Sequence, residues 1–153
     1  TLRSLSCRAG EKYLVVRSSL VSAFDNDFPD VFKSGSTIPV NFQLIIRNKN
    51  RILLSRNFQN SVRYDMANAV YEIRTGGMNR RLQTPSYAAM LAEISGFECS
   101  LPYDSSWGEV SISLTASLPS VRFEQLQKKV DLMVLWKYQK PKASTSLSLQ
   151  KPS

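Results

Sequence analysis

Residues 37–47, TIPVNFQLIIR, carry an apolar side chain at every second position between Ile38 and Ile46. A β-strand points successive side chains to opposite faces, so a period of two is typical of a strand with one buried face. The same alternation returns between Val110 and Leu118. The two segments predict a β scaffold whose buried face includes Ile38, Val40, Phe42, Leu44, Ile46, Val110, Ile112, Leu114, Ala116 and Leu118.

Helices interrupt the predicted strands at two places. Thr84 and Pro85 match the residues preferred at a helix cap and at the first helical position, and Gly96 matches the residue preferred just past a helix end. Acidic capping residues and spaced apolar residues predict a short helix near residues 27–33. The predicted fold class is mainly β. It is an antiparallel β-sandwich of roughly seven to nine strands with one main α-helix at about residues 85–95.

The length and composition predict one globular domain. A chain of 153 residues fits a single domain, and 42% hydrophobic residues are enough for an ordinary core. Residues 1–10 lack periodicity and read as an N-terminal arm, and residues 11–138 read as the single sandwich domain. From residue 139 onward Lys, Ser and Pro dominate, so we expect residues 139–153 to be a disordered tail.

The formal net charge of +8 is unevenly distributed along the chain. No acidic residue lies between Asp30 and Asp65, and the asparagines on either side of Lys49 predict a hairpin turn between two strands. Clustered cations create a local positive potential, and Trp is enriched at binding hot spots. The predicted partner-binding residues are Arg47, Lys49, Arg51 and Arg56 on this hairpin, with Trp107 in a later loop as an apolar anchor.

The residue types present do not form a recognisable catalytic set. The chain has no histidine, which is the commonest general base and the commonest nitrogen ligand for metals. The tightest acidic group, Asp25, Asp27 and Asp30, is explained by helix capping. We therefore predict a non-enzymatic protein with no metal and no cofactor. The alternative is an enzyme whose two carboxyl groups meet in a closed pocket.

The two cysteines leave two readings open. Cys7 and Cys99 are too few for a disulfide framework, but they can form one bridge in an oxidising compartment. Alternatively, Cys99 is a buried apolar residue and Cys7 is a free thiol in the arm. No stretch approaches the roughly 20 apolar residues of a membrane-spanning helix, so we predict no membrane span.

Three segments carry a family resemblance: RYDMANAVYEI at residues 63–73, SYAAML at residues 86–91, and the stretch that begins with GEV at residues 108–110. Over about residues 13–138 the pattern of apolar positions resembles the uncharacterised bacterial family known as domain of unknown function 4390. The resemblance implies an exported or periplasmic bacterial protein with a mostly antiparallel β fold and no assigned catalytic residues.

These observations favour a non-enzymatic, extracytoplasmic module of the bacterial envelope that binds other protein subunits or has a structural role in a larger assembly. The alternative is a polyanion-binding protein that grips nucleic acid or anionic lipid through the basic hairpin. Nucleic acid is the less favoured partner, because single-strand binding needs exposed aromatic platforms and Phe42 and Phe58 fall on the predicted buried face. Binding to a polyanion would weaken steeply with salt, whereas a protein contact with an apolar centre would weaken less.

Overall fold

The computed structural model describes residues 5–10, 12–20, 32–118, 120–123, 128–131 and 141–148, and most of them lie in antiparallel strands. This confirms the prediction of a mainly β, sandwich-like fold. The elements are β1 (Ser6–Ala9), β2 (Tyr13–Ser19), β3 (Ile38–Asn48), β4 (Arg51–Asp65), β5 (Val70–Thr75), β6 (Arg80–Thr84), α2 (Tyr87–Ser95), β7 (Gly96–Pro102), the short 3-10 helix η1 (Ser105–Trp107), β8 (Glu109–Ser117), β9 (Ser120–Phe123), β10 (Lys128–Asp131) and β11 (Lys142–Ser148).

The strands form one large sheet and two smaller ones. The large sheet has six strands in the order β11-β8-β3-β4-β5-β6, and each adjacent pair is antiparallel. Its centre is built from β3 and β8, the two alternating segments of the sequence. A three-stranded sheet has the order β1-β2-β7, and β9 and β10 form a separate two-stranded sheet.

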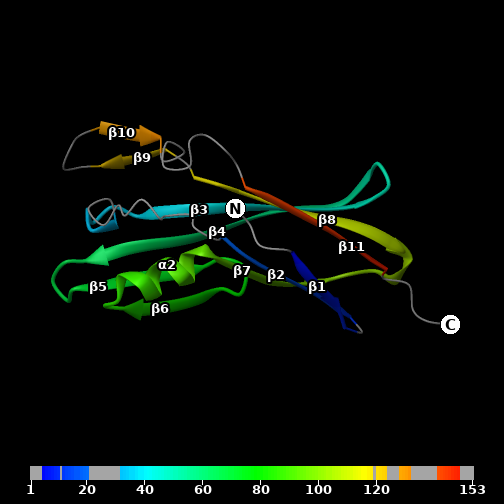
Figure 1. Cartoon of the computed structure of the whole chain (residues 1–153), viewed down its shortest axis with the longest axis horizontal. Helices are drawn as coiled ribbons and strands as arrows, with labels where there is room; N and C mark the ends of the chain where they lie inside the picture. The colour runs from blue at the N-terminus through cyan, green and yellow to red at the C-terminus, as the bar shows by residue number, and fades with distance from the viewer. Residues whose placement is uncertain are drawn as a thin grey trace.

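The second layer of the sandwich combines a helix with a sheet. Helix α2 packs on the part of the large sheet made by β4, β5 and β6 and leads directly into β7 of the three-stranded sheet. Figure 1 shows α2 beside β5 and β6 at one end of the molecule and the strands β1, β2 and β7 extending toward the other. One face of the long sheet is therefore covered first by the helix and then by the small sheet.

The core lies between these two layers. All ten residues predicted for the buried face, from Ile38 to Leu118, are buried in the structure. The second layer contributes Leu14 and Val16 from β2 and Met90 and Ile94 from α2. Each fully buried aliphatic side chain stabilises the fold by roughly 1.5–3 kcal/mol, so the two alternating strands supply a large share of the driving force for folding.

Helix α2 begins slightly later than its sequence signal predicts. Its N-cap is Ser86, whose Oγ accepts a hydrogen bond from the N–H of Ala89 at 3.1 Å. Thr84 instead ends β6, and its Oγ1 accepts a hydrogen bond from the N–H of Ser86. The two hydroxyls bond different amides, and only that of Ser86 reaches an N–H of the first helical turn, which is the contact that defines an N-cap. Within the described ranges, no helix has the length and apolar character needed to cross a membrane.

Strands occur beyond the predicted limits of the sandwich domain at both ends. Within the predicted arm, Ser6–Ala9 forms β1 and pairs with β2. Within the predicted disordered tail, Lys142–Ser148 forms β11 and pairs with β8 from Thr115 to Glu109. An edge strand is held largely by main-chain hydrogen bonds, so it needs few apolar side chains. Composition therefore missed both strands.

Two further predictions fall mostly outside the described residues. The short helix near residues 27–33 lies in a part of the chain of which only Phe32 and Lys33 are described, and Phe32 is fully buried. The apolar residues that alternate between Val130 and Tyr138 predict a last strand, of which the structure describes only Val130 and Asp131, at the end of β10.

Candidate functional site

The predicted basic hairpin is present, and its tip is a tight turn. Asn48 of β3 pairs with Arg51 of β4, which leaves Lys49 and Asn50 as the turn residues. Lys49 has a φ of 55°, in the left-handed region, although the sequence suggested that the neighbouring asparagines would take this conformation. Figure 1 shows this tip at the opposite end of the molecule from the turn between β4 and β5.

A β-bulge shapes the strand just beyond the tip. Ile46 pairs with Leu54, whereas Arg47 pairs with Ile52, so Leu53 has no direct cross-strand partner. Such a bulge redirects side chains locally. Leu53 and Leu54 are both half-buried and pack against the core, while Ile52 is 54% exposed. The bulge therefore brings an additional apolar side chain to the base of the tip.

The loop that carries Trp107 is held in place by hydrogen bonds between its own residues. The Asp104 carboxylate accepts a hydrogen bond from the N–H of Ser106 at 2.9 Å, and the Asp104 carbonyl accepts one from the N–H of Trp107 at 3.0 Å. Hydrogen bonds from the backbone and the side chain of Ser106 lower the pKa of the Asp104 carboxyl group below its usual value. Gly108 follows with a φ of 65°, a conformation that glycine adopts without strain. Trp107 is therefore presented from a defined loop.

The hairpin tip and the Trp107 loop meet. The Nδ2 of Asn48 donates a hydrogen bond to the carbonyl oxygen of Trp107 at 2.6 Å. A cavity of about 570 Å³ lies between the two segments, and it combines cationic, amide and apolar side chains. We call it the tip site; its lining residues are Asn48, Lys49, Asn50, Arg51, Leu53, Ser106 and Trp107.

The structure brings three of the five predicted partner-binding residues together, because Lys49, Arg51 and Trp107 all line the tip site. Arg47 follows the buried Ile46 and pairs with Ser111, so it lies on the outer face of the large sheet. Arg56 pairs with Leu44 and lies roughly 17 Å along β4 from Arg51, at about 3.4 Å per residue. Neither Arg47 nor Arg56 is among the residues that line this cavity.

The structure does not contain the disulfide considered from the sequence. Cys7 and Cys99 are both free thiols. Both pair with Val16, from opposite sides, so they lie two strands apart and their Cα atoms are separated by roughly 10 Å. A disulfide requires Cα atoms within about 7 Å of each other. Burial raises the pKa of Cys7 to about 11 and that of Cys99 to about 12.

A second cavity lies where α2 meets β7, and sequence reasoning did not single it out. Its volume is about 540 Å³, and Arg17 and Glu98 form an ion pair of 2.9 Å on its wall. Asn60, also on the wall, is 1% exposed. The available signal was the position of Asn60 between Phe58 and Val62, where the alternation calls for an apolar side chain.

No group of three or more His, Cys, Asp or Glu side chains that could hold a metal ion occurs among the residues that the structure describes. No family model, curated protein or solved structure matches this chain. The fold and the tip site together define a mainly β, sandwich-like protein with a cationic cavity at the end of its longest hairpin.

Proposed function

We propose that this chain is a non-enzymatic interaction module, and that its tip site binds an acidic face of another protein subunit. The observation that carries the proposal is the cavity of about 570 Å³ in which Lys49, Arg51 and Trp107 lie together. A cation beside a half-buried aromatic ring is the combination that protein interfaces favour at their energetic centres. We extend the proposal to the bacterial envelope, as an extracytoplasmic component of a larger assembly, on the strength of the family resemblance.

The arrangement of the tip site supports protein binding. The bulge at Leu53 and the hydrogen bond between Asn48 and the Trp107 carbonyl fix the site before any partner arrives. A fixed site costs less conformational entropy on binding than a flexible one. Asp104 belongs to the loop that presents Trp107, so the surroundings of the cavity are not uniformly positive.

A photo-crosslinking experiment in cells of the source organism tests the proposal. A benzophenone amino acid placed at Asn50 should capture a discrete protein, whereas the same group at Asn68, in the distant β4–β5 turn, should not. The double variant Lys49→Glu with Arg51→Glu should abolish capture. The matched control is Arg74→Glu with Arg81→Glu, which reverses the same number of charges on β5 and β6 and should retain capture. Equal capture from Asn50 and Asn68 would refute the proposal.

Polyanion binding is the second candidate, favoured by the absence of acidic residues between Asp30 and Asp65. Lys and Arg beside phosphates release counterions, which makes binding fall steeply as salt rises. Retention of DNA or of anionic vesicles by the purified protein, lost between low and moderate salt and abolished by Lys49→Glu with Arg51→Glu, would favour this function over the first. No retention at low salt would eliminate it.

A further inference from the structure

One edge of β4 is open over much of its length. β4 pairs with β3 from Arg51 to Val62, but it pairs with β5 only from Ser61 to Asp65. From Arg51 to Asn60, the other edge of β4 has no partner strand among the described residues. An unpaired edge exposes backbone N–H and C=O groups, which are the groups that extended peptides use when they add to a sheet.

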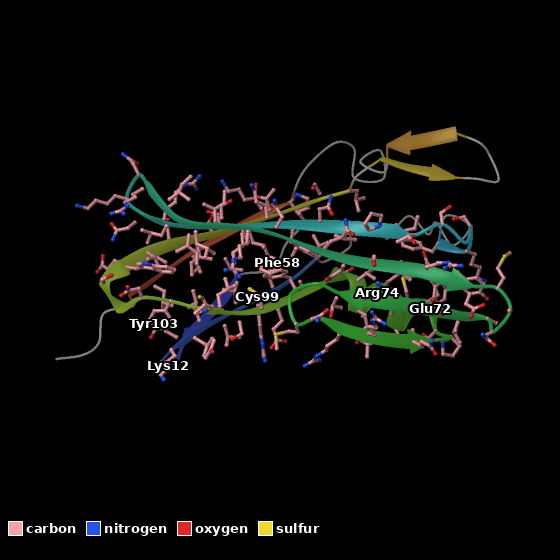
Figure 2. All side chains as sticks on the ribbon, turned by 180° about the vertical axis from the view of Figure 1, so that it is seen from behind. Lys12, Phe58, Glu72, Arg74, Cys99 and Tyr103 are labelled. Atoms are coloured by element: carbon pink, nitrogen blue, oxygen red, sulfur yellow. The ribbon has the colours of Figure 1, made fainter. Side chains whose placement is uncertain are left out.

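This open edge of β4 is close to an open edge of the three-stranded sheet. β7 pairs only with β2 in the described part of the chain. The ring of Phe58 on β4 lies 5.3 Å from the ring of Phe97 on β7, centre to centre. Figure 2 shows Phe58 and Cys99 at neighbouring positions on the two sheets. The open edges of β4 and β7 therefore lie next to each other, and we call this pair of edges the mouth of the sandwich.

The chain already inserts one of its own segments at one end of this mouth. A Cβ added to Gly76 would overlap the backbone of Gln59 on β4, and a Cβ added to Gly77 would overlap the backbone of Glu98 on β7. The turn between β5 and β6 is thus in close backbone contact with both edges. Between this contact and Arg51, no described strand pairs with the open edge of β4.

The side chains along the open edge define what could bind there. Leu54, Arg56 and Phe58 lie on the same face, because they pair with the buried residues Ile46, Leu44 and Phe42 of β3. Leu54 and Phe58 are half-buried, whereas Arg56 is exposed and forms no ion pair with any described residue. Opposite charges on directly paired strand residues are mutually stabilising. An added strand that fits this edge therefore carries an acidic residue opposite Arg56, with apolar residues two positions before and two positions after it.

Charge argues against a second copy of this chain as the added strand. The open segment of β4 carries two cations, Arg51 and Arg56, and no acidic residue, so antiparallel pairing with a second copy would bring like charges onto one short ladder. Like charges across paired strands are destabilising, and natural proteins use such charges to prevent edge-to-edge association. The occupant that fits is an acidic strand from a different protein.

We propose that the β4 edge from Arg51 to Phe58 binds an extended acidic segment of another protein as an added strand, with a carboxylate opposite Arg56. The inference goes beyond the proposed function, because the residues that would select the peptide, Leu54, Arg56 and Phe58, do not line the tip site; only Arg51 and Leu53, at the start of this edge, do.

A fluorescein-labelled peptide of sequence Thr-Val-Thr-Glu-Thr-Val-Thr, titrated into the full chain and followed by fluorescence anisotropy, tests the proposal. Arg56→Glu should weaken binding by about five-fold, the loss expected for one opposite-charge cross-strand pair. A peptide with Lys in place of Glu should bind Arg56→Glu better than the unaltered chain. The matched control, Arg74→Glu, changes the net charge equally but lies on β5, and it should bind the original peptide as the unaltered chain does.

Backbone hydrogen exchange locates the bound peptide. The peptide should slow amide exchange between Arg51 and Phe58 and leave exchange in β6, the edge strand at the end of the sheet, unchanged. Protection confined to β6, or equal weakening by Arg56→Glu and Arg74→Glu, would overturn the proposal. A stable dimer of the unaltered chain in sedimentation experiments without peptide would also overturn it. Lys49→Glu lies in the tip site and should leave peptide binding intact, which separates this test from that of the proposed function.

Discussion

The side chain of Asn60 holds the backbone of Gly76. Its Oδ1 accepts a hydrogen bond from the Gly76 N–H at 3.1 Å, and its Nδ2 donates to the carbonyl oxygens of Ile94 at 3.1 Å and Gly96 at 2.6 Å. One buried amide thus connects β4, the turn after β5 and the junction between α2 and β7. Buried polar groups are costly unless they are paired, and here the pairing joins the two layers of the sandwich.

Replacing Asn60 should destabilise the fold strongly. Asn60→Leu keeps a similar volume but leaves the Gly76 N–H and the carbonyl groups of Ile94 and Gly96 without their partner, at a cost of about 3 kcal/mol. The free energy of unfolding in urea measures this loss. Asn57→Leu, an exposed position on the same strand, is the control and should change the free energy by less than about 0.5 kcal/mol. Equal effects at the two positions would contradict the role assigned to Asn60.

Gly77 should not tolerate a side chain. A Cβ at this position would overlap the backbone carbonyl group of Glu98. Because backbone atoms cannot rotate away as a side chain can, a neighbouring strand must move. We expect Gly77→Ala to destabilise by about 2 kcal/mol, as forced overpacking does. At Gly10 an added Cβ would meet its nearest atom, the Tyr13 carbonyl oxygen, at an ordinary 3.5 Å, so Gly10→Ala should be nearly neutral. Thermal melting of the two variants makes the comparison, and similar melting temperatures would count against the close contact.

Replacing Ala69 with glycine should stabilise the fold. Its φ of 53° lies in the left-handed region, which costs an L-residue roughly 1–2 kcal/mol. Ala69→Gly removes this strain but adds flexibility to the unfolded chain, so the net stabilisation should be about 0.5 kcal/mol. Ala67→Gly, at an exposed position in the same turn, should instead destabilise by a similar amount. Chemical denaturation of both variants measures the change in the free energy of unfolding, which should be positive for Ala69→Gly and negative for Ala67→Gly. Changes of the same sign would argue against backbone strain at Ala69.

The thiols of Cys7 and Cys99 should react slowly. Burial raises their pKa values to about 11 and about 12, from an ordinary 9.0. At pH 8 the reactive thiolate of Cys7 is therefore about 100-fold scarcer than that of an exposed thiol, and its alkylation should slow correspondingly. Rates of iodoacetamide labelling, measured by mass spectrometry on Cys7→Ala and Cys99→Ala, assign each thiol. Labelling as fast as in urea would contradict the burial.

The same pKa shifts predict how stability depends on pH. Both thiols hold their protons more tightly in the folded state than in the unfolded state, so their contribution is complete below pH 9 and is lost as pH rises toward 11 and 12. The double variant Cys7→Ala with Cys99→Ala should therefore lose less stability between pH 9 and pH 11 than the unaltered chain. Parallel urea titrations at these two pH values measure the difference.

The alternation of residues 38–46 and 110–118 was sufficient to predict two central strands and every buried side chain on them. A period of two is a local property, and it persists in any sheet that buries one face. Residues 87–95 were likewise predictable as a helix, and the asparagines around Lys49 as a hairpin turn. The sequence by itself therefore determined the two alternating strands, the main helix, the basic hairpin and the mainly β class of this protein.

The tertiary structure alone decided which distant residues meet. Trp107 lies 58 positions after Lys49, and only the pairing of β3 with both β4 and β8 brings their loops to one cavity. The same pairing leaves Arg56 on an open edge, and β11 joins the sheet through main-chain bonds that composition does not record. Local patterns specify which face a side chain occupies, whereas contacts between segments depend on strand order and register, which are set by the packing of the whole chain.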